Sequence, residues 1–147
     1  MVTIKYNNVY VNNWFTICGS DEANGNIKNV NMVLKDKYYG EKTLEDAEIK
    51  MQKTVINNLS SVHDFNLVIG GDLSNQISVS SYGSLKYNIP FLGVYTACAT
   101  SVEQIIIAST FIDSKKINNC ICTTSSHNLA SEKQFRNPVE YGAPKPK

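Results

Sequence analysis

The sequence has no excess of charge of one sign and no long apolar run. Its 147 residues carry 14 basic and 13 acidic side chains, a net charge of +1, with no block of lysine or arginine. This balance gives no electrostatic basis for binding nucleic acid. The longest apolar patch, residues 105–112, is interrupted by Ser109 and Thr110 and is too short to span a bilayer. The N-terminus has no apolar stretch of signal-peptide length, so we expect neither export nor a membrane anchor.

The four cysteines lack the spacing of a disulfide framework. In a chain without an export signal, we expect them to be free thiols in a reducing compartment. Cys120 and Cys122 are two positions apart in an apolar run. They would share one face of a strand, and they lack the two-residue gap of a zinc knuckle. We therefore expect both to pack in the core.

Motifs of nucleotide, hydrolase and metal sites are also missing. Gly70-Gly71 lacks the third glycine of a dinucleotide-binding loop and the Lys-Ser/Thr pair of a P-loop. There is no Gly-x-Ser-x-Gly nucleophile turn and no histidine-rich metal motif. The sequence therefore predicts no cofactor and no metal, and any covalent chemistry would belong to a thiol.

Four apolar strand patterns alternate with three helical patterns along the chain. This order predicts a single α/β domain with a mainly parallel sheet and right-handed crossovers. Residues 19–40, polar and punctuated by glycine, are expected to be a long surface excursion. The strands are expected at residues 9–18, 65–69, 91–95 and 119–124, and the helices at 44–59, 73–85 and 101–113.

Two of the predicted helices have distinct patterns. Thr43 is placed to cap the first, whose apolar stripe is expected to face the core. That stripe consists of Leu44, Ala47, Met51, Val55 and Leu59. In the helix at residues 101–113, apolar side chains surround most of the circumference, so we expect it to be buried on several sides.

Cys98 lies between a predicted buried strand and the helix that follows it. Thr100 or Ser101 is expected to cap this helix, since Glu103 or Gln104 follows three residues later, as in a capping box. A helix N-terminus offers N–H donors and partial positive charge, which favour a thiolate and bind anions. The alternative is that Cys98 is a small buried apolar residue, as most free cysteines are.

Polar clusters follow three of the predicted strands. Because ligands bind beyond the carboxyl ends of parallel strands, these clusters are candidates for one binding site. They contain Asp72 and Asn75, then Cys98, then Ser126, His127 and Asn128.

Each candidate has an alternative role. His127 is a general acid or base for Cys98, a donor to a bound carboxylate, or a loop histidine bonded to a carbonyl group. Asp72 and Asn75 bind a ligand or are turn and cap residues. Arg136 pairs with an anion or with a core carboxylate.

Five segments share their order and spacing with one known family. They are residues 71–76, 89–92, 97–101, 124–128 and 132–142, and together they cover nearly the whole chain. The Ser-Ser-His-Asn and Gln-Phe-Arg-x-Pro-x-Glu-Tyr-Gly sequences are the most specific. The chain thereby resembles the stage V sporulation protein AD family, a branch of the thiolase-like superfamily.

The resemblance implies that residues 1–147 form the N-terminal half of a thiolase-like fold, whose C-terminal half is absent. It implies a cytoplasmic protein, peripheral to the inner membrane of the developing spore, and a homodimer in full-length members. Such a protein would bind dipicolinic acid, or its calcium chelate, and act with membrane proteins of the same operon in its uptake. The implied ligand-binding residues are Cys98, His127, Asn128, Ser126, Asp72, Asn75 and Arg136, with Cys98 as the thiolase-type cysteine.

Two other functions stay open at this point. One is an acyltransferase like thiolases and ketoacyl synthases, with Cys98 as its nucleophile. The other is an inactive half-domain from a split or interrupted gene. In either case the helix at residues 101–113 would expose an apolar outer face if the half-domain stood alone.

Overall fold

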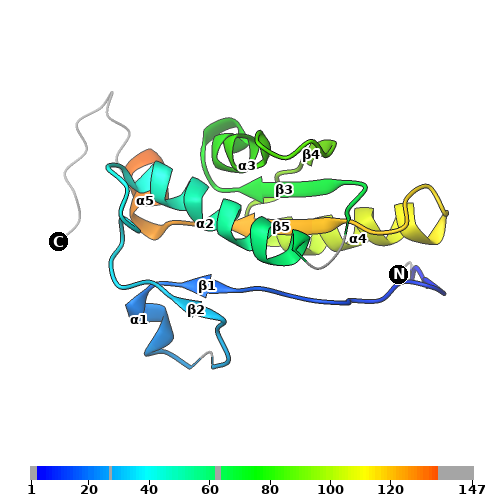
Figure 1. Cartoon of the computed structure of the whole chain (residues 1–147), viewed down its shortest axis with the longest axis horizontal. Coiled ribbons are helices and arrows are strands. Elements are labelled where there is room, and N and C mark those ends of the chain that lie inside the picture. The colour runs from blue at the N-terminus through cyan, green and yellow to red at the C-terminus, as the bar shows by residue number, and fades with distance from the viewer. Residues whose placement is uncertain (1–2, 27, 62–63, 136–147) are drawn as a thin grey trace.

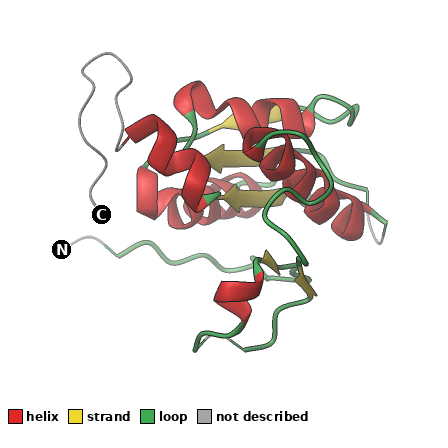
Figure 2. Ribbon diagram, turned by 90° about the vertical axis from the view of Figure 1, so that its left-hand side faces the viewer, coloured by secondary structure: helices red, strands yellow, loops and turns green. Residues whose placement is uncertain are grey.

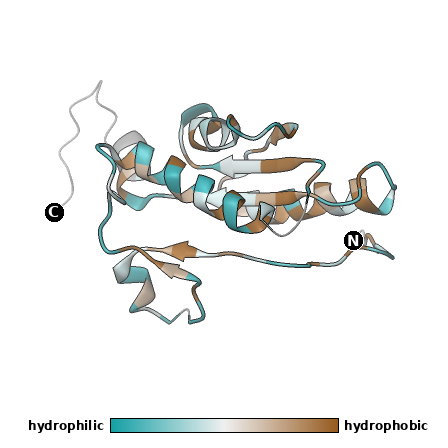
Figure 3. Ribbon diagram, in the orientation of Figure 1, coloured by the Kyte–Doolittle hydropathy of each residue, from teal (hydrophilic) through white to brown (hydrophobic). Residues whose placement is uncertain are grey.

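A computed structural model describes residues 3–26, 28–61 and 64–135. Within these ranges, three strands form a parallel sheet in the order β4-β3-β5. The central strand β3 (Val68–Asp72) lies between β4 (Phe91–Gly93) and β5 (Ile121–Ser125) and is buried along its whole length (Figure 1). Figure 3 shows β3 changing from apolar residues at its start to pale glycines near its end. The predicted α/β class with parallel strands is confirmed.

Helices cover both faces of this sheet, and the surroundings of two neighbouring glycines in β3 identify which helix covers which face. A side chain at Gly70 would meet Ser80 of α3 (Ser78–Ser84), whereas one at Gly71 would meet Thr100 and Gln104 of α4 (Thr100–Asp113). Successive residues of a strand face opposite sides. Helices α2 (Leu44–Ser60) and α3 therefore share one face, packed against each other, and α4 covers the other.

Each face has its own apolar core. Ile56, Val68 and Ile121 pack together on the side of α2. Ile69, Val94 and Ala108 pack on the side of α4. Cys120 and Cys122 are half-buried against this second cluster, as expected, and all four cysteines are free thiols.

The N-terminal part of the chain departs from the prediction. Of the strand expected at residues 9–18, only β1 (Ile17–Cys18) forms, and it pairs with β2 (Met32–Val33) rather than joining the main sheet. Figure 2 shows this small pair set apart from the three-stranded sheet. The preceding segment leaves Val11 and Trp14 exposed, so its apolar alternation has no buried face to fill. The excursion at residues 19–40 contains β2 and the short helix α1 (Ser20–Ala23).

Helix α2 begins as predicted, but it is turned by about one residue. The Thr43 hydroxyl accepts a hydrogen bond from the Asp46 N–H at 3.0 Å, which confirms the cap. The buried positions are Ala47, Glu48, Gln52 and Ile56, while Met51 and Val55 are only half-buried. Glu48 and Gln52 thus face the core, which the pattern had reserved for apolar side chains. They are buried because they form hydrogen bonds with Ser125 of the sheet.

Helix α4 exposes much of its apolar surface in this structure. Val102, Ile105 and Ile106 are 57%, 54% and 47% exposed, so the expected burial on several sides is wrong for this chain. The N-terminal segment forms hydrogen bonds with the middle and the C-terminal end of this helix. Tyr6 donates to the Ile106 carbonyl at 3.3 Å, and the Asn7 N–H donates to Asp113, the last residue of the helix, at 3.0 Å.

Candidate functional site

Cys98 is exposed at the carboxyl end of β4. It lies in the short 3₁₀ turn Ala97–Ala99, directly before α4. The alternative of a small buried apolar residue is therefore wrong. The predicted capping box is also wrong, since Ala99 holds the N-cap position and no side chain caps the helix.

Thr100 stabilises the Cys98 turn in another way. It is buried, accepts a hydrogen bond from the Thr96 N–H at 3.0 Å and donates one to the Ala97 carbonyl at 2.8 Å. The Thr96 hydroxyl in turn donates to Glu103 at 2.9 Å. These bonds close the turn around Cys98 and hold Ala97 in a left-handed conformation, with φ at 48°.

The β3–α3 connection has the same kind of backbone. Gln76 and Ile77 have φ values of 57° and 47°. A left-handed conformation is unfavourable for a β-branched residue such as isoleucine, and strain of this kind costs on the order of 1–3 kcal/mol per residue. Strained backbone therefore occurs in two neighbouring loops at the carboxyl edge of the sheet.

A pocket of about 410 Å³ opens between the ends of β3 and β4. Two short segments line it, one from each strand end. They are residues 74–77, which include the predicted site residue Asn75, and residues 93–95. Amide and hydroxyl groups thus share the pocket with apolar side chains, a lining typical of small-molecule sites. Cys98 follows three residues after Tyr95, just outside this lining.

Asp72 has a structural role in this chain. It is 1% exposed, and both carboxylate oxygens accept backbone hydrogen bonds. The Ser74 N–H donates at 2.8 Å and the Ser80 N–H, in the first turn of α3, at 2.7 Å. The geometry matches a turn and cap residue. Its side chain fixes the loop that carries Asn75.

His127 lies on the other side of the central strand from Cys98. Because β4 and β5 flank β3, their loops are separated by two strand spacings, roughly 10 Å. The His127 Nε2 lies 2.9 Å from the Lys37 carbonyl oxygen, as expected of a loop histidine. A carbonyl accepts only, so Nε2 carries a proton, and the buried Nδ1 has no partner within the described residues.

Ser126 and Asn128, which were also predicted as site residues, do not line the pocket. The Ser126 hydroxyl lies 3.4 Å from that of Ser131, and Asn128 is exposed at the start of α5 (Asn128–Phe135). Arg136 lies outside the described residues. The structure therefore brings Asn75 and Cys98 to one part of the edge and leaves His127 at another.

The sequence prediction missed two buried glutamines that hold this edge together. Gln52 donates to the hydroxyls of Ser80 at 2.9 Å and Ser125 at 2.8 Å, and accepts from Thr123 at 3.1 Å. On the opposite face, Gln104 donates to the Thr123 carbonyl at 2.7 Å. The run of Thr and Ser in β5 was the available signal, since a strand buried on both faces needs partners for its hydroxyls.

Glu48 is a third buried polar residue that the pattern did not reveal. It is 1% exposed and accepts a hydrogen bond from the Ser125 hydroxyl at 2.6 Å. Burial raises the pKa of this carboxyl above its ordinary value, while the bonds from Ser125 and the His127 backbone N–H act in the opposite direction. Glu48 thereby ties α2 to the start of the loop that carries His127.

Together these features define an α/β protein with a polar, pocketed carboxyl edge on its parallel sheet. The family model for "Stage V sporulation protein AD (SpoVAD)" matches residues 2–147. The chain therefore belongs to the stage V sporulation protein AD family. It is 35% identical over 148 residues to stage V sporulation protein AD of Bacillus subtilis (strain 168).

That alignment covers 94% of this chain but 43% of the relative, so the chain spans less than half of the relative's length. In the described part of the chain, no helix combines the length and the apolarity needed to cross a membrane.

Proposed function

We propose that this chain is the N-terminal, thiolase-like half of a sporulation protein and that the carboxyl edge of its sheet binds dipicolinate or its calcium chelate. The observation that carries the proposal is the pocket between residues 74–77 and 93–95, beside the exposed Cys98. Dipicolinate is a planar ring with two carboxylates. Its ring suits the apolar part of the lining, and the hydroxyl and amide groups of Ser74 and Asn75 suit its oxygens.

A second half of the protein would complete this site. The exposed apolar face of α4 and the partial coverage of the relative both support such a half, on the same or a separate polypeptide. Its packing on Val102, Ile105 and Ile106 would place new side chains close to Cys98. We further propose that the complete protein works beside membrane proteins of its operon at the inner membrane of the developing spore.

Isothermal titration calorimetry with dipicolinate tests the binding role. We expect heat of binding from this chain or from a version extended with a typical second half. Isophthalate, which keeps both carboxylates but lacks the ring nitrogen, separates recognition of the ligand from simple charge attraction. Absence of binding by both forms would reject the proposal.

Two variants locate the site. A methyl group at Gly93 would collide with the Ile77 side chain, so Gly93→Ala fills or distorts the pocket and should remove binding. Asn118→Ala, at the opposite end of the sheet, is the matched control and should bind normally.

Acyl transfer by Cys98 is the second candidate, favoured by the exposure of the thiol beside the N-terminus of α4. Within the described residues, no acidic or histidine side chain is hydrogen-bonded to this thiol, so activation by a base has no support. A mass increase on Cys98 after incubation with acyl-coenzyme A, lost in Cys98→Ser, would establish this function. Its absence would exclude it.

A further inference from the structure

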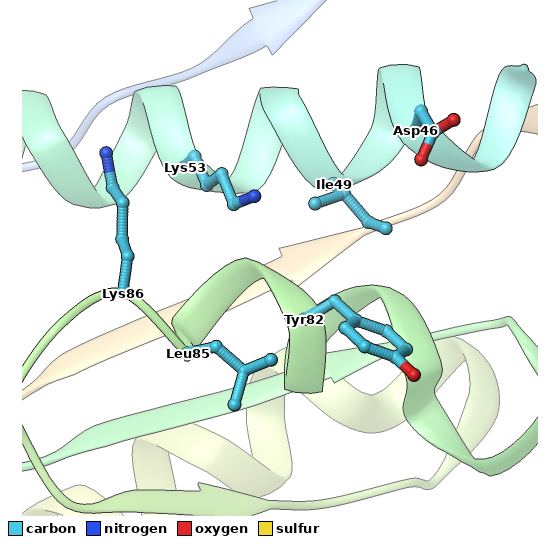
Figure 4. Close-up of a pocket in the computed structure, with 6 residues that line it drawn as sticks. All are labelled: Asp46, Ile49, Lys53, Tyr82, Leu85 and Lys86. Atoms are coloured by element: carbon cyan, nitrogen blue, oxygen red, sulfur yellow. The ribbon is translucent and has the colours of Figure 1, made fainter. Parts of the chain in front are cut away.

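The outer face of the α2–α3 pair carries a groove that the proposed site does not use. Its volume is about 380 Å³, and both helices together with the turn after α3 line it. Figure 4 shows the lining residues Asp46, Ile49, Lys53, Tyr82, Leu85 and Lys86. The groove lies on the opposite side of the sheet from α4, so it is separate from the apolar face discussed above.

The middle of the groove is apolar and open to solvent. Tyr82 and Leu85 are 59% and 73% exposed, and Ile49 lies half-buried between the helices. Large exposed aromatic and aliphatic side chains on a fixed frame are typical of contacts between proteins.

Contacts within the chain hold α2, α3 and the turn after α3 in fixed positions around the groove. The two helices approach closely at Gly83, where a side chain would lie 3.2 Å from the Gln52 Cβ. The Tyr87 hydroxyl donates to the Lys53 carbonyl at 2.9 Å and lies 2.7 Å from the Asn57 side-chain oxygen. These bonds tie the turn after α3 to α2, so association would need little rearrangement.

Charges of opposite sign stand at the two ends of the groove. Asp46, Ile49 and Lys53 are on one face of α2, and the rise of a helix puts Lys53 about 10 Å from Asp46. Lys86 stands at the Lys53 end (Figure 4). A two-fold axis through the apolar middle would set Asp46 of one copy against both lysines of another. A partner of one charge sign would match only one end.

We propose that this groove is a self-complementary contact between two copies of this chain, with Tyr82 and Leu85 packed at its centre. The contact is small, so the dimer should be weak, with a Kd on the order of 0.1 mM or higher. The family resemblance also implies a homodimer of full-length members, which would pair beside the elements that carry Cys98, so the groove contact is a separate one.

Charge-reversal variants, whose dimerisation is measured by analytical ultracentrifugation, test the proposal. At low salt and about 1 mM protein, the unchanged chain should dimerise. Asp46→Lys alone and Lys53→Glu with Lys86→Glu should each be monomeric, because like charges would then meet across the axis. An equimolar mixture of the two variants should form a heterodimer. Circular dichroism first checks their folding, since Asp46→Lys loses the 2.7 Å bond from the Thr43 hydroxyl.

The matched control is Lys115→Glu with Lys116→Glu, which has the same net charge change on an exposed turn after α4. It should dimerise like the unchanged chain and fail to pair with Asp46→Lys. Leu85→Asp, at an exposed position, should abolish dimerisation without affecting folding.

Three results would overturn the proposal. They are a monomeric unchanged chain at 1 mM, a mixture without heterodimer, and a dimer that responds to Val102→Ser and Ile105→Ser but not to the charge reversals.

Discussion

Replacing Glu48 by Gln should stabilise the protein increasingly as the pH rises. The buried carboxyl lies in an environment that disfavours its charge, and burial is the main cause of its raised pKa. Gln keeps the size of the side chain and an oxygen that accepts from Ser125 and from the His127 N–H. It removes the charge that burial and the Asp72 carboxylate oppose, and it replaces the second oxygen with an amide nitrogen.

The raised pKa of Glu48 explains why the stabilisation by Glu48→Gln grows with pH. A carboxyl whose pKa is raised in the folded state binds its proton more tightly there than in the unfolded chain. Its favourable contribution is therefore fully present below the ordinary pKa of glutamate and is lost as the pH rises through the folded-state value. The slope is at most about 1.4 kcal/mol per pH unit for one proton, and the total loss is about 1.4 kcal/mol for each unit by which the pKa is raised.

Urea unfolding between pH 4 and pH 8 measures this difference. The free energy of unfolding of Glu48→Gln, minus that of the unchanged chain, should be near zero or negative at pH 4 and should increase toward pH 8. Glu22→Gln, an exposed control on α1, should show no such trend. A difference that is constant with pH, or that falls as the pH rises, would refute the account of Glu48.

Two substitutions and one labelling measurement test the structure around the Cys98 turn. Thr100→Val keeps the shape but loses the bonds to Thr96 and Ala97, and should lower the free energy of unfolding by about 1–3 kcal/mol in urea titrations. Gly71→Ala would collide with Thr100 and the Val94 carbonyl and should cost about 1–3 kcal/mol or more, seen as a lower melting temperature. Cys98 should react with iodoacetamide far faster than Cys122, which mass spectrometry of digests would show. The bond with Cys120, and then burial, raises the pKa of the Cys122 thiol.

The sequence predicted the fold best where a local signal and burial agree. Thr43 caps α2, and the strands at the centre of the chain form a parallel sheet, although β3 and β5 begin two to three residues later than expected. Apolar runs and small turn residues were sufficient evidence for these elements. The end of β3 was less certain because Gly70, Gly71 and Asp72 do not look like strand formers, yet they pair with Thr123, Thr124 and Ser125 of β5.

Other features depend on contacts that no local pattern contains. The alternating segment before Ile17 does not join the main sheet, because strand pairing is decided by long-range packing. Glu48 and Gln52 resembled solvent-facing residues of a helix, and only the hydroxyls of β5 explain their burial. Asp72 and Asn75 were correctly assigned to the edge of the sheet. Their different roles could not be separated until the bonds from Ser74 and Ser80 to Asp72 were seen.

The pocket at the carboxyl edge is the central claim, and chemical-shift mapping in a ¹⁵N-labelled sample tests it most directly. On addition of dipicolinate, the amide signals of residues 74–77, 93–95 and 98 should move together with one saturation curve. Signals of Ile49, Tyr82 and Leu85 in the α2–α3 groove should stay in place. Shifts confined to that groove or to the exposed face of α4, with the edge residues unmoved, would contradict the account.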